Sequence, residues 1–105
     1  MISIDAFRKL ALSFPGTEEQ PHFHLASFRV KKKIFATLWE NENKAMLKLS
    51  LIDQSVFCSY NNDIFYAVPG GWGTKGATFV ELKKVRKDMI KDALTLAYNL
   101  SLTKK

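Results

Sequence analysis

The sequence predicts a two-layer α+β domain with an antiparallel five-stranded sheet, in the element order α-β-β-β-α-β-β-α. One observation is a set of three short runs rich in β-branched and aromatic residues, Leu25–Val30, Lys33–Trp39 and Lys44–Leu49, with only short polar breaks between them. Such spacing is typical of an antiparallel meander. The other observation is that segments of helical periodicity flank the meander and need a sheet to pack against.

The first helix is expected to begin after Ser3, whose hydroxyl can accept a hydrogen bond from the first turn. Its apolar face consists of residues at helical spacing, namely Ile4, Phe7, Leu10, Ala11 and Phe14. Pro15-Gly16 ends the helix. The segment Thr17–His24 is polar and interrupted by Pro21, so we interpret it as a loop.

A two-residue turn at Lys31-Lys32 would define the register of the first hairpin. On one face it pairs Phe28 with Phe35 and Ala26 with Thr37, and on the other it pairs Arg29 with Ile34 and Ser27 with Ala36. Asn-Gly is preferred over two lysines in such a turn, because both positions need a positive φ. A wider loop, which would shift these pairs, is the alternative.

The second half of the chain alternates helix and strand. Ser50 to Asp53 fits a capping box, which begins a helix that runs to about Tyr60 with Val56, Phe57 and Tyr60 on its inner face. Strands at about Ile64–Val68 and Gly76–Leu82 enclose a loop of three glycines around Trp72. The last helix, roughly Lys84–Ser101, has one apolar side made of Val85, Met89, Ile90, Ala93, Leu94, Ala97 and Leu100.

Composition indicates one folded domain over residues 1–105, because 47% of the residues are hydrophobic and only 25% are charged. The single cysteine, Cys58, excludes an internal disulfide. We see no signal peptide and no apolar run long enough to span a membrane, so we expect a cytoplasmic protein. The net charge of +6 favours anionic partners, although a solvated lysine-rich surface would have the same composition.

The basic residues form two groups that are far apart in the sequence. Arg29, Lys31, Lys32 and Lys33 surround the first hairpin turn, where they could contact phosphates or simply discourage edge pairing. Lys83, Lys84, Arg86 and Lys87 are placed in the first turn of the last helix, where the helix dipole disfavours cations unless an anion docks there.

Trp72 is a candidate stacking residue or apolar anchor, with Lys75 close by in the sequence. Trp39 is a weaker candidate, and partial burial is the commoner fate of either indole. His22 and His24 lack the spacing and the second cysteine of a zinc site, and Cys58 is expected to be a small buried thiol. We therefore predict no catalytic residues, metal or cofactor, and no enzyme activity.

Several motifs in this order resemble the MmcQ/YjbR family over about residues 5–100. They are Phe14-Pro15-Gly16, Glu18-Glu19, Pro21, Phe28-Arg29-Val30, Lys33-Ile34-Phe35-Ala36, Lys48-Leu49 and Gly71-Trp72. The resemblance implies a fold similar to type III secretion chaperones and DNA binding through a double-wing arrangement of hairpins. Two stretches depart from the family pattern: Lys31-Lys32 replace turn glycines, and Gly73–Ala77 lacks a bulky residue, which casts doubt on a shared groove there.

The leading hypothesis is a small cytoplasmic nucleic-acid-binding protein, with DNA the favoured ligand. Its contact residues would be Arg29, Lys31, Lys32, Lys33, Trp72, Lys75, Lys83, Lys84, Arg86 and Lys87. This hypothesis requires folding to bring both basic groups onto one surface. The alternative is a protein- or peptide-interaction module, either monomeric or dimeric. It predicts an exposed apolar patch around Phe28, Phe35, Trp39 or Trp72. A small-ligand or regulatory domain also stays open.

Overall fold

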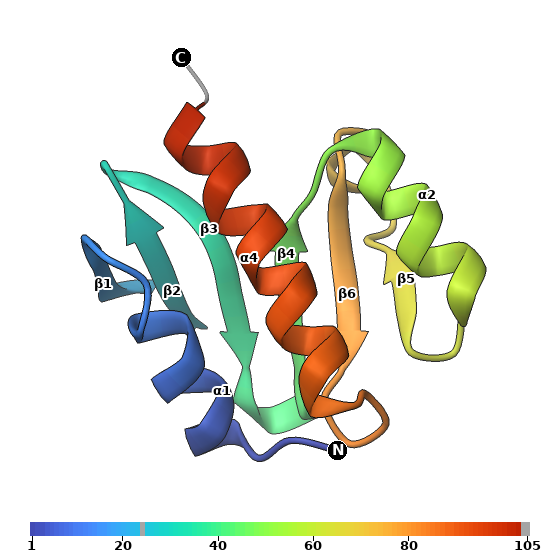
Figure 1. The fold of residues 1–105 in the computed structure, drawn as a ribbon, viewed down its shortest axis with the longest axis horizontal. Helices are drawn as coiled ribbons and strands as arrows, with labels where there is room; N and C mark the ends of the chain where they lie inside the picture. Colours follow the sequence, from blue (N-terminus) through green and yellow to red (C-terminus); the bar gives the residue numbers. More distant parts are fainter. Residues whose placement is uncertain (24, 104–105) are drawn as a thin grey trace.

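The protein folds into one six-stranded antiparallel sheet with three helices on one face, as seen in a computed structural model that describes residues 1–23 and 25–103 (Figure 1). The strand order is β1-β2-β3-β4-β6-β5. The strands are β1 (Thr17–His22), β2 (Leu25–Val30), β3 (Lys33–Trp39), β4 (Lys44–Lys48), β5 (Phe65–Ala67) and β6 (Ala77–Glu81).

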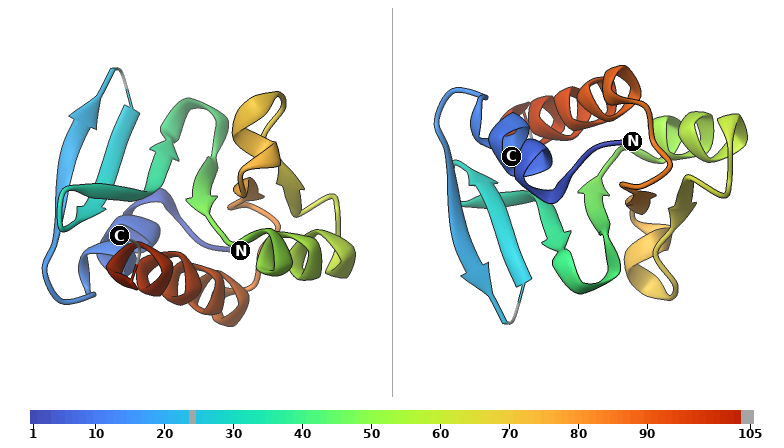
Figure 2. Two further views of the ribbon diagram at one scale, coloured as in Figure 1. Left: turned by 90° about the horizontal axis from the view of Figure 1, so that it is seen from above. Right: turned by 90° about the horizontal axis from the view of Figure 1, so that it is seen from below.

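The helices are α1 (Ile4–Leu12), α2 (Leu51–Tyr60), α3 (Gly71–Thr74) and α4 (Lys87–Thr103), with a 3-10 turn η1 (Glu40–Glu42) after β3. Figure 2 shows α1, α2 and α4 on one side of the sheet and the short α3 on the other. We call the side without α1, α2 and α4 the open face. No helix in the described part of the chain is long and apolar enough to cross a membrane.

The two-layer α+β architecture is confirmed, but the expected number of strands is wrong. The segment interpreted as a loop contains β1, which pairs with β2 from Thr17↔Val30 to His22↔Leu25. β1 is an edge strand that pairs with one neighbour only, and most of its side chains are exposed. An edge strand tolerates both polar residues and Pro21, because one row of its N–H groups needs no partner in the sheet.

The two-residue turn at Lys31-Lys32 is present, and the predicted pair Arg29↔Ile34 is confirmed. A bulge shifts the other pairs by one residue, so that Phe28 faces Ala36 instead of Phe35. Phe35 then has no direct partner on β2, and both phenylalanine rings are fully buried. The bulge thus turns two consecutive residues of β3, Phe35 and Ala36, into buried positions.

The caps of the first two helices are confirmed. The Ser3 hydroxyl accepts a hydrogen bond from the Ala6 N–H at 3.0 Å, and the Ser50 hydroxyl accepts one from the Asp53 N–H at 3.1 Å. The core lies between α1, α4 and the middle of the sheet. The Phe14 ring stacks on Tyr98 of α4 at 4.8 Å, and the Tyr98 hydroxyl donates to the Pro15 carbonyl at 2.5 Å.

Two expectations about the helices are wrong. α2 buries Phe57 against Phe65 of β5, but Val56 and Tyr60 are exposed. Because α2 lies over the β5 edge of the sheet, only a narrow side of the helix packs against the rest of the protein. The last helix begins at Lys87, because the Glu81 carbonyl accepts the N–H groups of Lys84 and Val85 and closes a separate turn before it.

Candidate functional site

The β2–β3 turn presents two exposed lysines in an unusual backbone conformation. Lys31 and Lys32 have φ angles of 51° and 68°, in the left-handed region that residues other than glycine and asparagine rarely adopt. None of the ion pairs formed between described residues includes either lysine. The turn therefore places two cations in solvent at a position where neutral Asn-Gly would be more stable.

The two predicted basic groups lie at opposite ends of the sheet (Figure 1). β3 starts beside the turn at Lys33 and ends at Trp39, which pairs with Lys44, and Lys44 in turn pairs with Glu81. The segment 82–87 follows Glu81, so about 20 Å of strand separates it from the turn. The expectation that one surface holds both groups is wrong. The antiparallel pairing of β3, β4 and β6 places the segment 82–87 beside the end of β3, whereas the turn lies beside its start.

The second basic group is mixed with acids. Lys83, Lys84 and Arg86 precede α4, and of the predicted cations only Lys87 is in its first turn, next to Asp88. Arg86 pairs with Asp88 at 3.1 Å. Nearby, Lys44 pairs with Glu42 at 3.0 Å. Asp88 complements the helix dipole and pairs with Arg86, so it would compete with the anion that we predicted to dock at this helix start.

Trp72 lies at the same end of the sheet as the β2–β3 turn. It belongs to α3, directly before β6, whose first residue Ala77 pairs with Lys48 at the end of β4. The indole is 65% exposed, and the Lys48 Nζ lies 6.0 Å from its ring centroid. An exposed indole beside a cation has the two features that stacked bases and phosphates need.

Close backbone packing holds α3 in place. A Cβ on Gly73 would lie 1.9 Å from the Val68 carbonyl oxygen, so only glycine fits there. The Gln54 side-chain amide of α2 donates to the Gly73 carbonyl at 2.9 Å and to the Ala77 carbonyl at 3.1 Å. Trp72 is therefore presented by a fixed turn, in which position 73 has no room for a side chain.

We use "hairpin end" for the cations and the indole at this end of the sheet, namely Lys31, Lys32, Lys33, Lys48, Trp72 and Lys75. Lys48 was missed by the sequence analysis. The signal for it was the alternation in β4, where Ala45 and Leu47 are buried and Lys44, Met46 and Lys48 occupy the open face. Arg29 lies further along β2, where its Nε donates to the Ser27 hydroxyl at 3.1 Å.

Trp39 belongs to an aromatic row on the open face at the other end of the sheet. Its ring meets Phe79 edge-on at 5.1 Å, and Phe79 contacts Tyr66 at 5.7 Å. The Lys44 Nζ lies 4.0 Å from the Phe79 centroid and 5.5 Å from that of Trp39. The indole N–H donates to the Thr37 hydroxyl at 2.9 Å. Trp39 is thus half-buried and already has partners within the protein.

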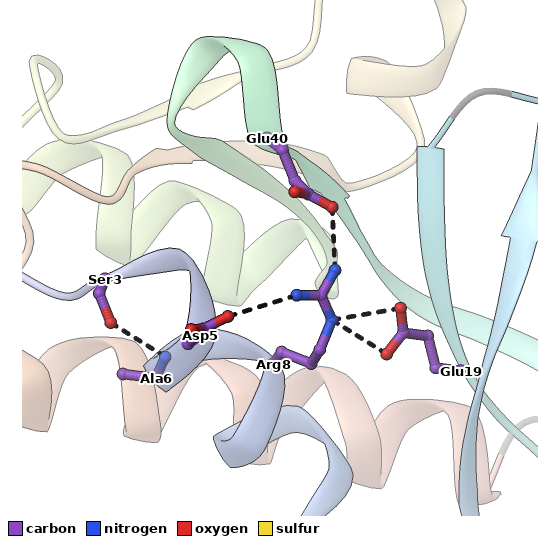
Figure 3. Close-up of polar contacts among 6 residues, drawn as sticks. All are labelled: Ser3, Asp5, Ala6, Arg8, Glu19 and Glu40. Atoms are coloured by element: carbon purple, nitrogen blue, oxygen red, sulfur yellow. Dashed lines mark hydrogen bonds and ion pairs between the residues drawn. The ribbon is translucent and has the colours of Figure 1, made fainter.

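Arg8 of α1 links three elements (Figure 3). Its Nε donates to both carboxylate oxygens of Glu19 on β1, at 3.1 and 3.2 Å, and its Nη2 donates to Glu40 of η1 at 2.9 Å. Burial alone would lower the pKa of Arg8, but the Glu40 hydrogen bond and the charge of Glu19 outweigh it and raise that pKa. With Asp5 also 3.6 Å away, the guanidinium is surrounded by acids and is not offered to an anion.

The described residues contain no cluster of three or more His, Cys, Asp or Glu that could hold a metal. His24 lies outside the described residues. Burial raises the pKa of the Cys58 thiol, so the less reactive protonated form predominates at neutral pH.

Comparisons with known proteins identify the fold and a family. The model of the YjbR family matches residues 12–100. The crystal structure of the Deinococcus radiodurans protein DR2400, described as a DUF419 domain, is similar with a TM-score of 0.87 at 18% identity, covering 99% of this chain and 81% of that chain. No curated protein matches the sequence significantly. At this identity the structural likeness is evidence for the fold alone.

Proposed function

The chain belongs to the YjbR family, and we propose that it binds nucleic acid, DNA in the first place, through the hairpin end of its sheet. The two lysines of the β2–β3 turn are the observation that carries the proposal. Both occupy the left-handed region without the glycine or asparagine that would relieve it, and both are exposed. Lysine is unfavourable at a positive φ, so its presence at both exposed positions indicates that the two charges have a functional role.

Charge supports this end of the sheet over the other. Five lysines belong to the hairpin end, and the described residues show no ion pair that involves Lys31, Lys32, Lys48 or Lys75. At the other end Arg86 pairs with Asp88 and the nearby Lys44 pairs with Glu42, so we leave Lys83, Lys84, Arg86 and Lys87 out of the proposed interface. Binding of this kind contacts phosphates, releases counterions and reads little sequence.

Trp72 adds a second type of contact. Its exposed ring, with Lys48 against one part of it, would stack on an unpaired base or lie against the sugar-phosphate backbone. Base stacking on an aromatic ring contributes about 1–3 kcal/mol and tolerates any sequence. Arg29, further along β2, would flank the interface.

The test is titration of a short labelled duplex at several salt concentrations between about 50 and 200 mM. We expect Lys31→Gln with Lys32→Gln to weaken binding and to reduce the slope of log K against log salt by about two. The matched control, Lys83→Gln with Lys84→Gln, removes the same charge at the other end and should leave the slope unchanged.

Two results would contradict the proposal. One is a wild-type protein that does not bind at low salt. The other is an equal loss of slope in both double variants, because that would assign binding to net charge and not to the hairpin end. A Trp72→Ala variant tested on single-stranded DNA separates stacking from phosphate contact, since its salt slope should match that of the wild type.

The protein-interaction alternative loses most of the patch that it required. Phe28 and Phe35 are fully buried, and Trp39 is half-buried beneath its own partners, so of those four residues only Trp72 is exposed. Whether the protein lacks enzyme activity and where in the cell it works stay predictions. A different apolar surface does exist, on α2, and it supports a separate inference.

A further inference from the structure

The outer face of α2 is apolar and exposed. Leu51 is 58%, Ile52 77%, Val56 59% and Tyr60 56% exposed, whereas Phe57 is buried in the core and Cys58 packs against it. Ile52, Val56 and Tyr60 follow one another at intervals of four residues, so they form one stripe along the helix. Exposed aliphatic residues are normal when scattered, but a continuous stripe is typical of a contact surface.

We propose that this stripe is the contact between two copies of the chain, which form a weak twofold homodimer through α2. The stripe is self-complementary because Val56 lies at its centre. When two α2 helices cross antiparallel about a twofold axis, Val56 faces the Val56 of the second copy and Ile52 faces its Tyr60. Each contact then occurs twice, as an isologous interface requires.

The two ends of α2 present different surfaces. At its N-terminal end Leu51 and Ile52 project into solvent. At its C-terminal end lies a shallow groove of about 590 Å³ lined by Ser55, Cys58, Ser59, Tyr60, Asn61 and Asn62. The twofold arrangement places the projecting end of each copy over the groove of the other. The small Ser55 and Ser59 flank the stripe and leave room for helix axes to approach within about 8–10 Å.

Repulsion between two copies is weaker at this face than over the lysine-rich remainder of the chain. The segment from Leu49 to Thr74 contains two acids, Asp53 and Asp63, and no lysine or arginine. The net charge of +6 therefore becomes +8 for the rest of the chain, since the segment contributes −2. Two copies repel one another over most of their surface, and α2, which has no cation and only Asp53 as a charged residue, is the stretch across which they can approach.

The area available agrees with a weak dimer. Given the exposed fractions above, the four side chains would bury roughly 300 Å² of apolar surface per copy. Since interfaces are a little more than half apolar, the whole contact would cover about 1,000 Å², at the lower limit of specific interfaces. Such a dimer should form at concentrations between about 10 µM and 1 mM.

The experiment is sedimentation equilibrium of the full chain over that concentration range. We expect the wild type to dimerise, and Val56→Arg to shift the dissociation constant upward by at least about tenfold, because it places two cations face to face at the twofold axis. The control is Phe23→Arg, which adds the same charge at a side chain that is 88% exposed and lies far from α2. It should dimerise like the wild type.

Salt provides a second readout. Raising the salt concentration should strengthen the dimer, because it screens the repulsion between two copies of charge +6. The same change should weaken DNA binding, so the two activities are distinguishable. Lys31→Gln with Lys32→Gln should lower DNA binding and leave the dimer intact.

A wild type that stays monomeric up to about 1 mM in high salt overturns the proposal. So does a dimer that Val56→Arg leaves unchanged, or one that Phe23→Arg disrupts equally, because each would place the contact elsewhere. Val56 is exposed, so the variant should keep the circular dichroism spectrum and melting temperature of the wild-type monomer. Amide chemical shifts that change with concentration should be confined to about residues 51–62.

Discussion

The hydrogen bond from the Tyr66 hydroxyl to Glu81 joins β5 to β6 on the open face of the sheet. Burial of the hydroxyl, this hydrogen bond and the negative charges of Glu81 and Glu42 raise the pKa of Tyr66 to about 12. The unfolded chain releases the same proton near pH 10. The folded state therefore binds this proton more tightly than the unfolded state does.

The contribution of this contact to stability should be complete below about pH 10 and decline as the pH rises towards 12. We expect the free energy of unfolding to fall more steeply over that interval in the wild type than in Tyr66→Phe. Urea unfolding at a series of alkaline pH values measures both slopes, and the other titrating groups cancel in the difference. Equal slopes would show that Tyr66 does not hold its proton more tightly in the folded state.

Arg8 acts as a tie between α1, β1 and η1, through Glu19 and Glu40. We expect Arg8→Met to lower the free energy of unfolding by about 1 kcal/mol, since the pairs are partly exposed and solvent weakens them. The more exposed pair of Arg86 and Asp88 serves as a comparison, and Arg86→Met should have a smaller effect. Urea unfolding in low salt and in about 0.5 M NaCl measures both, and the Arg8 effect should shrink with salt. An Arg8 effect no larger than that of Arg86 would contradict this account.

At the scale of elements, the β2–β3 turn combines strain with charge. Lys31→Asn with Lys32→Gly should raise the free energy of unfolding by about 1 kcal/mol, because it relieves two left-handed lysines. The same variant should bind DNA less tightly, because two cations are lost. Urea unfolding and duplex titration measure the two effects.

Lys31→Gln with Lys32→Gln separates the two causes. Glutamine removes the charge but keeps the strained backbone, so this variant should bind weakly without a gain in stability. If the Asn-Gly variant bound DNA as tightly as the wild type, the strained turn would have no role in binding. If it were not more stable, the left-handed lysines would not be strained.

At the scale of the whole molecule, α4 crosses the sheet and joins its parts into a single core. Leu94 is fully buried on its inner face, among residues contributed by the sheet and by α1. We expect Leu94→Ala to lower the free energy of unfolding by about 3 kcal/mol through lost burial and the cavity left behind. Far-UV circular dichroism and tryptophan fluorescence should still report one shared transition. Two separate transitions would indicate that the sheet and the helices do not share one core.

The distribution of charge is also a property of the whole molecule. The net charge of +6 gives no hint of how the charges are arranged: among the described residues Lys31 and Lys48 at one end of the sheet form no ion pair, whereas Arg86 and Lys44 at the other end pair with acids. The direction of the strands decides at which end each charge lies, because successive antiparallel strands run towards opposite ends of the sheet. Of the predicted interface, the hairpin lysines and Trp72 therefore lie at one end of the sheet, and the residues beside α4 lie at the other.

Local patterns in the sequence determined most of the elements. The apolar runs identified β2, β3, β4, β5 and β6 within a residue or two, and Ser3 and Ser50 marked the starts of α1 and α2. These signals are local because a strand or a cap depends on residues only a few positions apart. The likeness to the YjbR family was also contained in the sequence, in the order of short motifs along the chain.

Tertiary structure alone decided the rest. β1 is a strand because β2 offers it an open edge, which its polar sequence does not reveal. Val56 and Tyr60 are exposed because α2 lies at the margin of the sheet, although the same residues would suit a core. Lys48 and Trp72 lie at the same end of the sheet as the β2–β3 turn only because antiparallel pairing places the end of β4 and the start of β6 there. Periodicity tells which side chains share a face of an element, but neighbouring elements decide what that face meets.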